Sequence, residues 1–291
     1  MSTRLLAIVF FAGVLHGAFA GEKADLSAES LRVNFSKARK LLNSQSALNS
    51  ISSERVMKTE FGTPTHRGVE LKSADLTLTM DPATGQILSI EKKAETENSS
   101  LPTINTNQAE NIARSLVRQL GLKIDSGMRL INRGFDSSTG RWGIAWEKQI
   151  DGYPFPEETV FVLFNDRDRS IAIFRDRTTD LKCSTKPIIE ENTARMSAEH
   201  CVNYLLPEMF GEHYEIGGIT QGKLQVVYPN RRYVSQDGLE GTGLQEAELQ
   251  PRLVYSFDLT FRYTGTSSLR ISTAPIAIWV DALTGNVIGG L

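Results

Sequence analysis

The sequence predicts an α+β fold in which two tandem modules, each a helix packed on an antiparallel sheet, follow an amphipathic N-terminal helix. An apolar helical pattern occurs twice, 85 positions apart, first in the stretch that begins at Pro102 and again in the stretch that begins at Pro187. Short segments that alternate apolar and polar residues surround both copies, as antiparallel strands with one buried face do. A helix combined with several strands, used twice, fits both observations.

The two helical stretches are "PTINTNQAENIARSLVRQL" and "PIIEENTARMSAEHCVNYL". Their shared apolar positions recur at helical spacing and form one stripe, and the small alanines in it allow a helix to lie close against a sheet. In the first copy Asn105 suits the N-cap with Gln108 three residues later, and Glu110 and Arg114 are spaced as an i,i+4 ion pair. The aligned positions are Ile104 and Ile189, Ala109 and Ala194, Ala113 and Ala198, Val117 and Val202, and Leu120 and Leu205.

Strand signals fill the space between the helices. Trp142, Ile144 and Trp146 project to one face at a period of two, which predicts the core under the first helix; the alternative is a pair of tryptophans that line a ligand groove. Asp151 and Gly152 predict a hairpin turn between two such strands. A turn in "MDPATGQILSI" near the start of the chain is closely similar to one in "IWVDALTGNVIGGL" at its end.

These signals divide the chain into four parts. Residues 1–20 are expected to be a signal peptide, residues 21–60 an N-terminal helical segment, residues 61–178 the first module and residues 179–291 the second. The segment Ser235–Gln250 shows no period and is expected to be a long surface loop. The apolar stripe of the N-terminal helix is Leu31, Phe35, Ala38 and Leu42.

The first twenty residues have the pattern of a secretory signal. Arg4 precedes a short apolar run, and "AFA" predicts cleavage between Ala20 and Gly21. The apolar run is too short for a membrane span, and no later run approaches that length. We therefore expect a secreted or periplasmic protein without a membrane span.

Charge argues against nucleic acid as a partner. The chain has 32 basic and 34 acidic residues, a formal net charge of −2, and these charges are scattered rather than grouped. Affinity for nucleic acid depends largely on Lys and Arg that neutralise phosphates. The scattered charges are expected to form a solvated surface.

Cys183 and Cys201 are the two cysteines of the chain. In an oxidising compartment an even pair favours a disulfide, and we expect one between these two residues. Closing a loop of this length would stabilise the fold by about 3 kcal/mol in the chain-entropy model. The alternative is two buried thiols.

The helices and strands together resemble the PepSY superfamily, which includes the propeptides of thermolysin-like and fungalysin-like metalloproteases. The likeness rests on the Pro-x-Ile starts at Pro102 and Pro187, on "WEKQIDGYPFPEETVFVLFNDRDRSIAIF", and on "WVDALTGNVIGG", which is similar to the ending of such propeptides. It covers roughly residues 74–291. The resemblance implies a cystatin-like fold, a helix lying on an antiparallel sheet, in each module.

In protease precursors, the resemblance implies two roles: assisting the folding of the catalytic domain and occluding its cleft. This chain departs from that pattern, because it nowhere contains His-Glu-x-x-His and stops at Leu291 where a protease domain would follow. We expect the propeptide-like part to be the entire protein.

Local signatures of catalysis are missing from the sequence. His66, His200 and His213 have neither a histidine at i+4 nor a Cys-x-x-Cys nearby, and no Gly-x-Ser-x-Gly elbow or phosphate-binding loop occurs. We therefore expect no cofactor, no metal and no enzymatic activity. Five aspartates are expected to cap turns rather than to bind calcium: Asp81, Asp151, Asp166, Asp168 and Asp281.

The sequence supports one leading functional hypothesis and two alternatives. The first is an exported, non-catalytic PepSY-like protein that binds a polypeptide, for example a secreted peptidase that it inhibits or chaperones in trans. Strand addition at a sheet edge would serve this purpose with backbone groups alone. The alternatives are an envelope-associated structural protein without a protease link, and a hydrolase whose site is assembled from distant residues.

Overall fold

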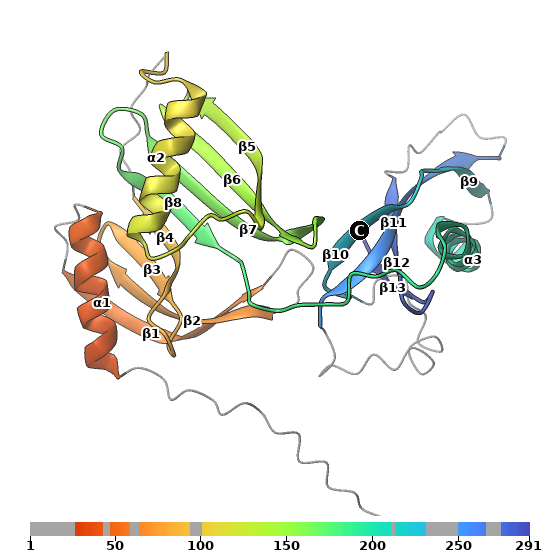
Figure 1. Ribbon diagram of the computed structural model, residues 1–291, viewed down its shortest axis with the longest axis horizontal. Helices are drawn as coiled ribbons and strands as arrows, with labels where there is room; N and C mark the ends of the chain where they lie inside the picture. The colour runs from red at the N-terminus through yellow and green to blue at the C-terminus, as the bar shows by residue number, and fades with distance from the viewer. Residues whose placement is uncertain are drawn as a thin grey trace, which may run out of the picture.

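The computed structural model describes residues 27–42, 47–58, 64–93, 101–210, 213–230, 250–265 and 275–291. The predicted signal peptide lies outside these residues, as does the loop Ser235–Gln250 except for its last residue. The described chain has three helices and two antiparallel sheets (Figure 1). The predicted α+β class, with helices packed on antiparallel sheets, is therefore confirmed.

One sheet has eight strands, in the order β1-β2-β3-β4-β8-β7-β6-β5. Both α1 and α2 lie on the same face of this sheet (Figure 1), and their apolar residues share one core with it. Its elements are α1 (Ala28–Leu41), β1 (Leu48–Lys58), β2 (Pro64–Ser73), β3 (Leu76–Met80), β4 (Ile87–Lys92), α2 (Thr106–Gln119), β5 (Met128–Asp136), β6 (Arg141–Ile150), β7 (Tyr153–Asn165) and β8 (Ile171–Asp176).

The second sheet has five strands and carries α3 on one face. Its order is β10-β11-β12-β13, and β9 pairs with the remaining length of β11, so β9 and β10 together occupy the place of one strand. Its elements are α3 (Glu191–Phe210), β9 (Tyr214–Ile219), β10 (Lys223–Val227), β11 (Arg252–Tyr263), β12 (Ile276–Asp281) and β13 (Val287–Gly290).

The described part of the chain repeats one unit three times, a helix followed by a four-stranded meander. The first repeat is α1 with β1–β4, the second is α2 with β5–β8, and the third is α3 with β9–β13. The first two repeats join edge to edge through β4 and β8. The segment 21–60, for which we expected only a helix, thus also contains β1, a strand too polar to show an alternating pattern.

A shared detail supports this division into three repeats. In each fourth strand, one extra residue interrupts the register on the third strand of the same repeat. The three extra residues are Leu88, Ala172 and Ile288, and all three are buried.

The alanine stripes lie where the sequence predicts them. On α2, Ala109, Ala113 and Val117 are fully buried against the first sheet, and on α3 Ala194 and Ala198 are fully buried against the second. Asn105 and Gln108 form the expected capping box at the start of α2. Helices held close to a sheet by small residues are therefore the basis of the second and third repeats.

The tryptophans of β6 belong to the core. Trp142 and Trp146 are buried under α2, and Trp142 donates a hydrogen bond to Asp166 Oδ1 at 2.8 Å. The second carboxylate oxygen of Asp166 accepts from the backbone N–H of Thr103 at 2.6 Å. Burial opposes the charge of Asp166, but these hydrogen bonds and nearby Arg169 still hold its pKa below the usual value.

The similar turns noticed in the sequence are similar in structure. Asp81 Oδ1 accepts from the N–H groups of residues 83 and 84, and Asp281 Oδ1 accepts from residues 283 and 284. Gly85 and Gly285 close the two turns at φ of 73° and 80°, a region that glycine enters without strain. Each turn connects the third and fourth strands of its repeat.

Replacing Asp281 with alanine is expected to lower the free energy of unfolding by about 1.5–3 kcal/mol, because two backbone N–H groups lose a charged acceptor. Urea denaturation measures the change. Asp281→Asn keeps the acceptor oxygen and serves as the matched control, so it is expected to cost less. Equal stability of the alanine variant and the wild type would contradict this role.

Candidate functional site

The strand β7 is interrupted by three residues where it passes the second sheet. Glu147 pairs with Thr159, but the next residue of β6, Lys148, pairs with Phe155. Residues 156–158 therefore stand out of the ladder and form what we call the β7 bulge. The bulge carries Glu157 and Glu158, whose exposed fractions are 5% and 0%.

Glu158 is surrounded by donors. Its carboxylate accepts from Lys148 Nζ at 2.8 Å, from the backbone N–H and the hydroxyl of Thr179, and from the hydroxyl of Tyr228 at 2.5 Å. These donors come from β6, from the segment after β8 and from the end of β10. A buried carboxylate is stable only when it is paired and hydrogen-bonded in this way.

Glu157 fixes the same junction from the neighbouring position. Its Oε1 accepts from the backbone N–H of Tyr228 at 3.1 Å. The rings of Phe155 and Tyr228 lie 5.0 Å apart, and Phe155 is packed in the core of the second sheet although it belongs to β7. The β7 bulge therefore joins the second repeat to the third through polar and apolar contacts.

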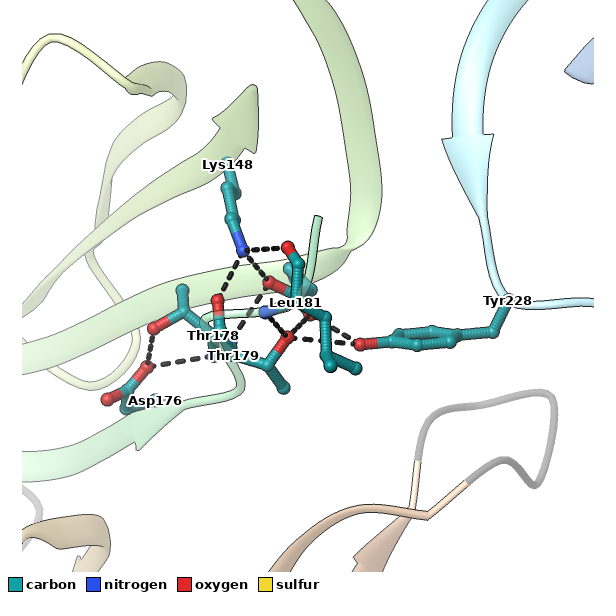
Figure 2. A network of polar contacts seen from close by, with 7 residues as sticks. Lys148, Asp176, Thr178, Thr179, Leu181 and Tyr228 are labelled. Carbon is teal, nitrogen blue, oxygen red and sulfur yellow. Dashed lines mark hydrogen bonds and ion pairs between the residues drawn. The ribbon is translucent and has the colours of Figure 1, made fainter. Parts of the chain in front are cut away.

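Lys148 and Tyr228 also make their other polar contacts within this junction. Lys148 Nζ also donates to the carbonyl oxygens of Thr179 and Leu181 (Figure 2). Burial and the hydrogen bond to Glu158 raise the pKa of Tyr228 well above its ordinary value, so its hydroxyl stays protonated. Nearby, Asp176 accepts from the N–H and hydroxyl of Thr178. The network holds β6, the segment after β8 and the end of β10 together.

A cavity of about 370 Å³ opens beside this junction. Lys148 and Thr179 line it together with Asp151, Asp180 and Cys183. Asp151 accepts a hydrogen bond from Thr185 at 2.5 Å. No histidine is among the residues that line this cavity.

Cys183 and Cys201, both within the described residues, are not joined by a disulfide, so the predicted bridge is not present in the structure. An even cysteine count favours a bridge only where the fold brings the two Cα atoms within about 7 Å of each other. Both thiols are half-buried. Burial raises the pKa of Cys183, and it raises that of Cys201 to about 11, so both thiols are protonated at neutral pH.

The histidines are dispersed. His200 is exposed on α3, His213 is exposed beside the ring of Tyr263, and His66 lies in β2. Among the residues that the structure describes, no three His, Cys, Asp or Glu side chains are grouped to hold a metal ion.

No helix in the described part of the chain has the length and apolar character needed to span a bilayer.

The outer edge of β5 is the second candidate site. Among the described strands β5 pairs only with β6, and Ile131 stands out of the ladder as a bulge with an exposed fraction of 47%. Beyond this bulge the strand runs regularly from Asn132 to Asp136. This stretch presents backbone groups to solvent along one side of the eight-stranded sheet.

Comparisons with known proteins assign this chain to no family. No family model and no curated protein matches the sequence. One similar solved structure is described as "Bacillus megaterium YpeB C-terminal domain"; it matches with a TM-score of 0.43 and 12% sequence identity, over 92% of this chain and 97% of that chain. A likeness of this degree carries no statement about function.

The helices and turns were predictable from the sequence, whereas the junction at the β7 bulge was not. The segment that contains Lys148, Glu157 and Glu158 was predicted to form strands and a turn, with no role for these three residues. The sequence did contain a local sign of an interrupted strand. Pro156 and the two glutamates after it directly precede "TVFVLF" and fit poorly in the interior of a strand. Thr179 and Tyr228 carry no comparable local signal, since the fold brings them to Glu158 from distant positions.

Proposed function

We propose that this protein is an exported, non-catalytic module that binds an extended polypeptide along the outer edge of β5. The observation that carries the proposal is the regular edge Asn132–Asp136, which has no partner strand among the described residues. Strand addition to such an edge uses backbone hydrogen bonds for affinity and alternate side chains for specificity.

The register indicates which backbone groups are available. Gln149 N donates to Gly127 O at 2.7 Å. Every second residue of β6, counted back from Gln149 to Arg141, therefore turns its N–H group toward β5. Beyond the bulge at Ile131, this alternation turns the N–H and C=O groups of Arg133 and Phe135 outward. These two residues would form the backbone bonds to an added strand.

The side chains of β5 leave this edge accessible. Arg129 is paired with Glu147 at 2.6 Å, and Arg133 lies 3.5 Å from Glu110 of α2. Both arginines are thus drawn back over the faces of their own repeat rather than across the edge. A methyl group at Gly134 would meet nothing within 4 Å, which leaves space beside the edge for a partner side chain.

A secreted peptidase is the partner that the PepSY resemblance supports. A chain of this kind would occupy or assist the peptidase as a separate molecule. The four hydrogen bonds that Glu158 accepts in the β7 bulge favour a rigid support for binding over a reactive centre.

The proposal is tested by selecting binders from a phage-displayed library of random peptides and comparing two variants of one residue. Arg133→Pro removes an outward N–H from the edge, whereas Arg133→Ala removes the same side chain and keeps the N–H. We expect selected peptides to bind the wild type and Arg133→Ala, and to lose at least tenfold in affinity for Arg133→Pro. Equal binding to both variants, with both folded by circular dichroism, would overturn the proposed site.

A parallel arm tests the partner. Thermolysin is incubated with the wild type and with each variant, and its activity on a peptide substrate is measured. Inhibition by the wild type and Arg133→Ala but not by Arg133→Pro supports a peptidase partner at β5. If none of them affects thermolysin although peptides still bind, the edge remains supported and this protease is excluded as the partner.

A further inference from the structure

The first two repeats show how one repeat of this fold joins another. Their fourth strands pair antiparallel, with Ile90 opposite Phe174 at the centre of the contact. Ser89 lies opposite Arg175, and Glu91 lies opposite Ile173. The contact lies just beyond the extra residues Leu88 and Ala172, and it extends the two meanders into one eight-stranded sheet.

The strand β13 is the corresponding strand of the third repeat. Its extra residue is Ile288, so Gly290 holds the position that Ile90 and Phe174 hold in the first two repeats. Among the described strands β13 pairs only with β12. The position at which the other two repeats join each other is therefore not used for strand pairing in the third.

That position is occupied by one side chain. Asn230 Oδ1 accepts from the N–H of Gly290 at 3.1 Å, and Asn230 Nδ2 donates to the carbonyl oxygen of Gly290 at 2.6 Å. A primary amide that binds both groups of one residue reproduces the pair of bonds that a neighbouring strand would make. Asn230 thus takes the place of the central residue of a partner strand.

The sequence of β13 leaves room for this contact. A Cβ at Gly289 would lie 2.3 Å from Asn230 Oδ1 and 3.0 Å from Asn230 N, so no larger residue fits there with Asn230 in place. The strand itself, "VIGG", has no charge and no proline to discourage pairing.

We propose that β13 is a pairing edge for a second copy of this chain, and that Asn230 closes the edge in the single chain. When Asn230 leaves Gly290, two copies pair antiparallel about a two-fold axis, with Gly290 opposite its own equivalent. Residue 289 of each copy then lies opposite residue 291 of the other. This register repeats the pairing of β4 with β8, in which equivalent positions also face each other.

The test is the oligomeric state of Asn230→Ala in the full-length chain, measured by analytical ultracentrifugation over a range of concentrations. The expected result is a doubling of the weight-average mass at high concentration, while the wild type keeps the mass of one chain. Asn286→Ala, in the exposed turn before β13, is the matched control and is expected to behave as the wild type. Asn230→Asp retains the acceptor and loses the donor, so it is expected to dimerise more weakly than Asn230→Ala.

Amide hydrogen exchange locates the contact. In Asn230→Ala the N–H of Gly290 is expected to exchange rapidly at low concentration and slowly at high concentration. A variant that stays monomeric up to its solubility limit, or one that dimerises without this protection, would overturn the inference. Adding Arg133→Pro, which acts on β5, is expected to leave the dimer unchanged, so this result is separable from the proposed function.

Discussion

Replacing Glu158 with alanine is expected to lower the free energy of unfolding by about 3–5 kcal/mol, the largest effect of any single charged residue described above. The substitution leaves Lys148, whose side chain is largely buried, without its carboxylate partner. It also removes the acceptor of Thr179 and Tyr228, and Tyr228 is almost fully buried. A buried donor without an acceptor costs more than the hydrogen bond itself contributes.

The matched control for this prediction is Glu91→Ala. Glu91 also forms an ion pair with a basic residue, Arg175, at 3.6 Å, but both side chains are exposed. Its removal is expected to change stability by about 0.5 kcal/mol or less. Guanidinium chloride denaturation measures the free energy of unfolding of both variants. Equal stabilities would show that the junction does not depend on Glu158.

Replacing Phe155 with alanine is expected to cost about 3–5 kcal/mol, and the loss is expected to fall mainly on the second sheet. Phe155 is fully buried and lies in the core of the third repeat, although the chain reaches it from β7 of the second. Its removal leaves a cavity beside Tyr228, where the two sheets meet. The third repeat is therefore expected to unfold at a lower denaturant concentration than the first two.

Tryptophan fluorescence can follow the two sheets separately. Trp142 and Trp146 lie in the first sheet and Trp279 lies in the second. Trp279→Phe variants with and without the Phe155 substitution report on the first sheet alone. Far-ultraviolet circular dichroism reports on both sheets. If Phe155→Ala shifts both signals equally, the residue stabilises the molecule as a whole rather than the second sheet.

The fold was predictable from sequence wherever one pattern controlled the local structure. The alanine stripes of α2 and α3 predicted the buried faces because helical spacing alone decides which residues share a face. The turns at Asp81 and Asp281 were predictable because aspartate and glycine at fixed spacing satisfy the backbone locally.

The threefold repetition was harder to see than the twofold one. The helix α1 lacks the Pro-x-Ile start of the other two, and β1 has no alternating apolar pattern, so the first repeat did not align with the others. The similarity of "MDPATGQILSI" to the last residues of the chain was the visible trace of that repeat. The break between β9 and β10 further disguised the third repeat.

The junction at Glu158 and the contact of Asn230 with Gly290 depend on residues that lie 70 and 60 positions apart. Single-sequence patterns report local spacing, and nothing local to Tyr228 or Asn230 indicates these partners. The missing disulfide has the same origin, because a cysteine count gives no distance between the two thiols.

The most direct test of the central claim is amide hydrogen exchange by NMR, with and without a peptide selected for binding. If an extended polypeptide adds to β5, exchange of the N–H groups of Arg133 and Phe135 is expected to slow on binding. The inward N–H groups of Gly134 and Asp136 are already paired with β6 and are expected to change little. Protection confined to other elements, with Arg133 and Phe135 unchanged, would contradict binding at this edge.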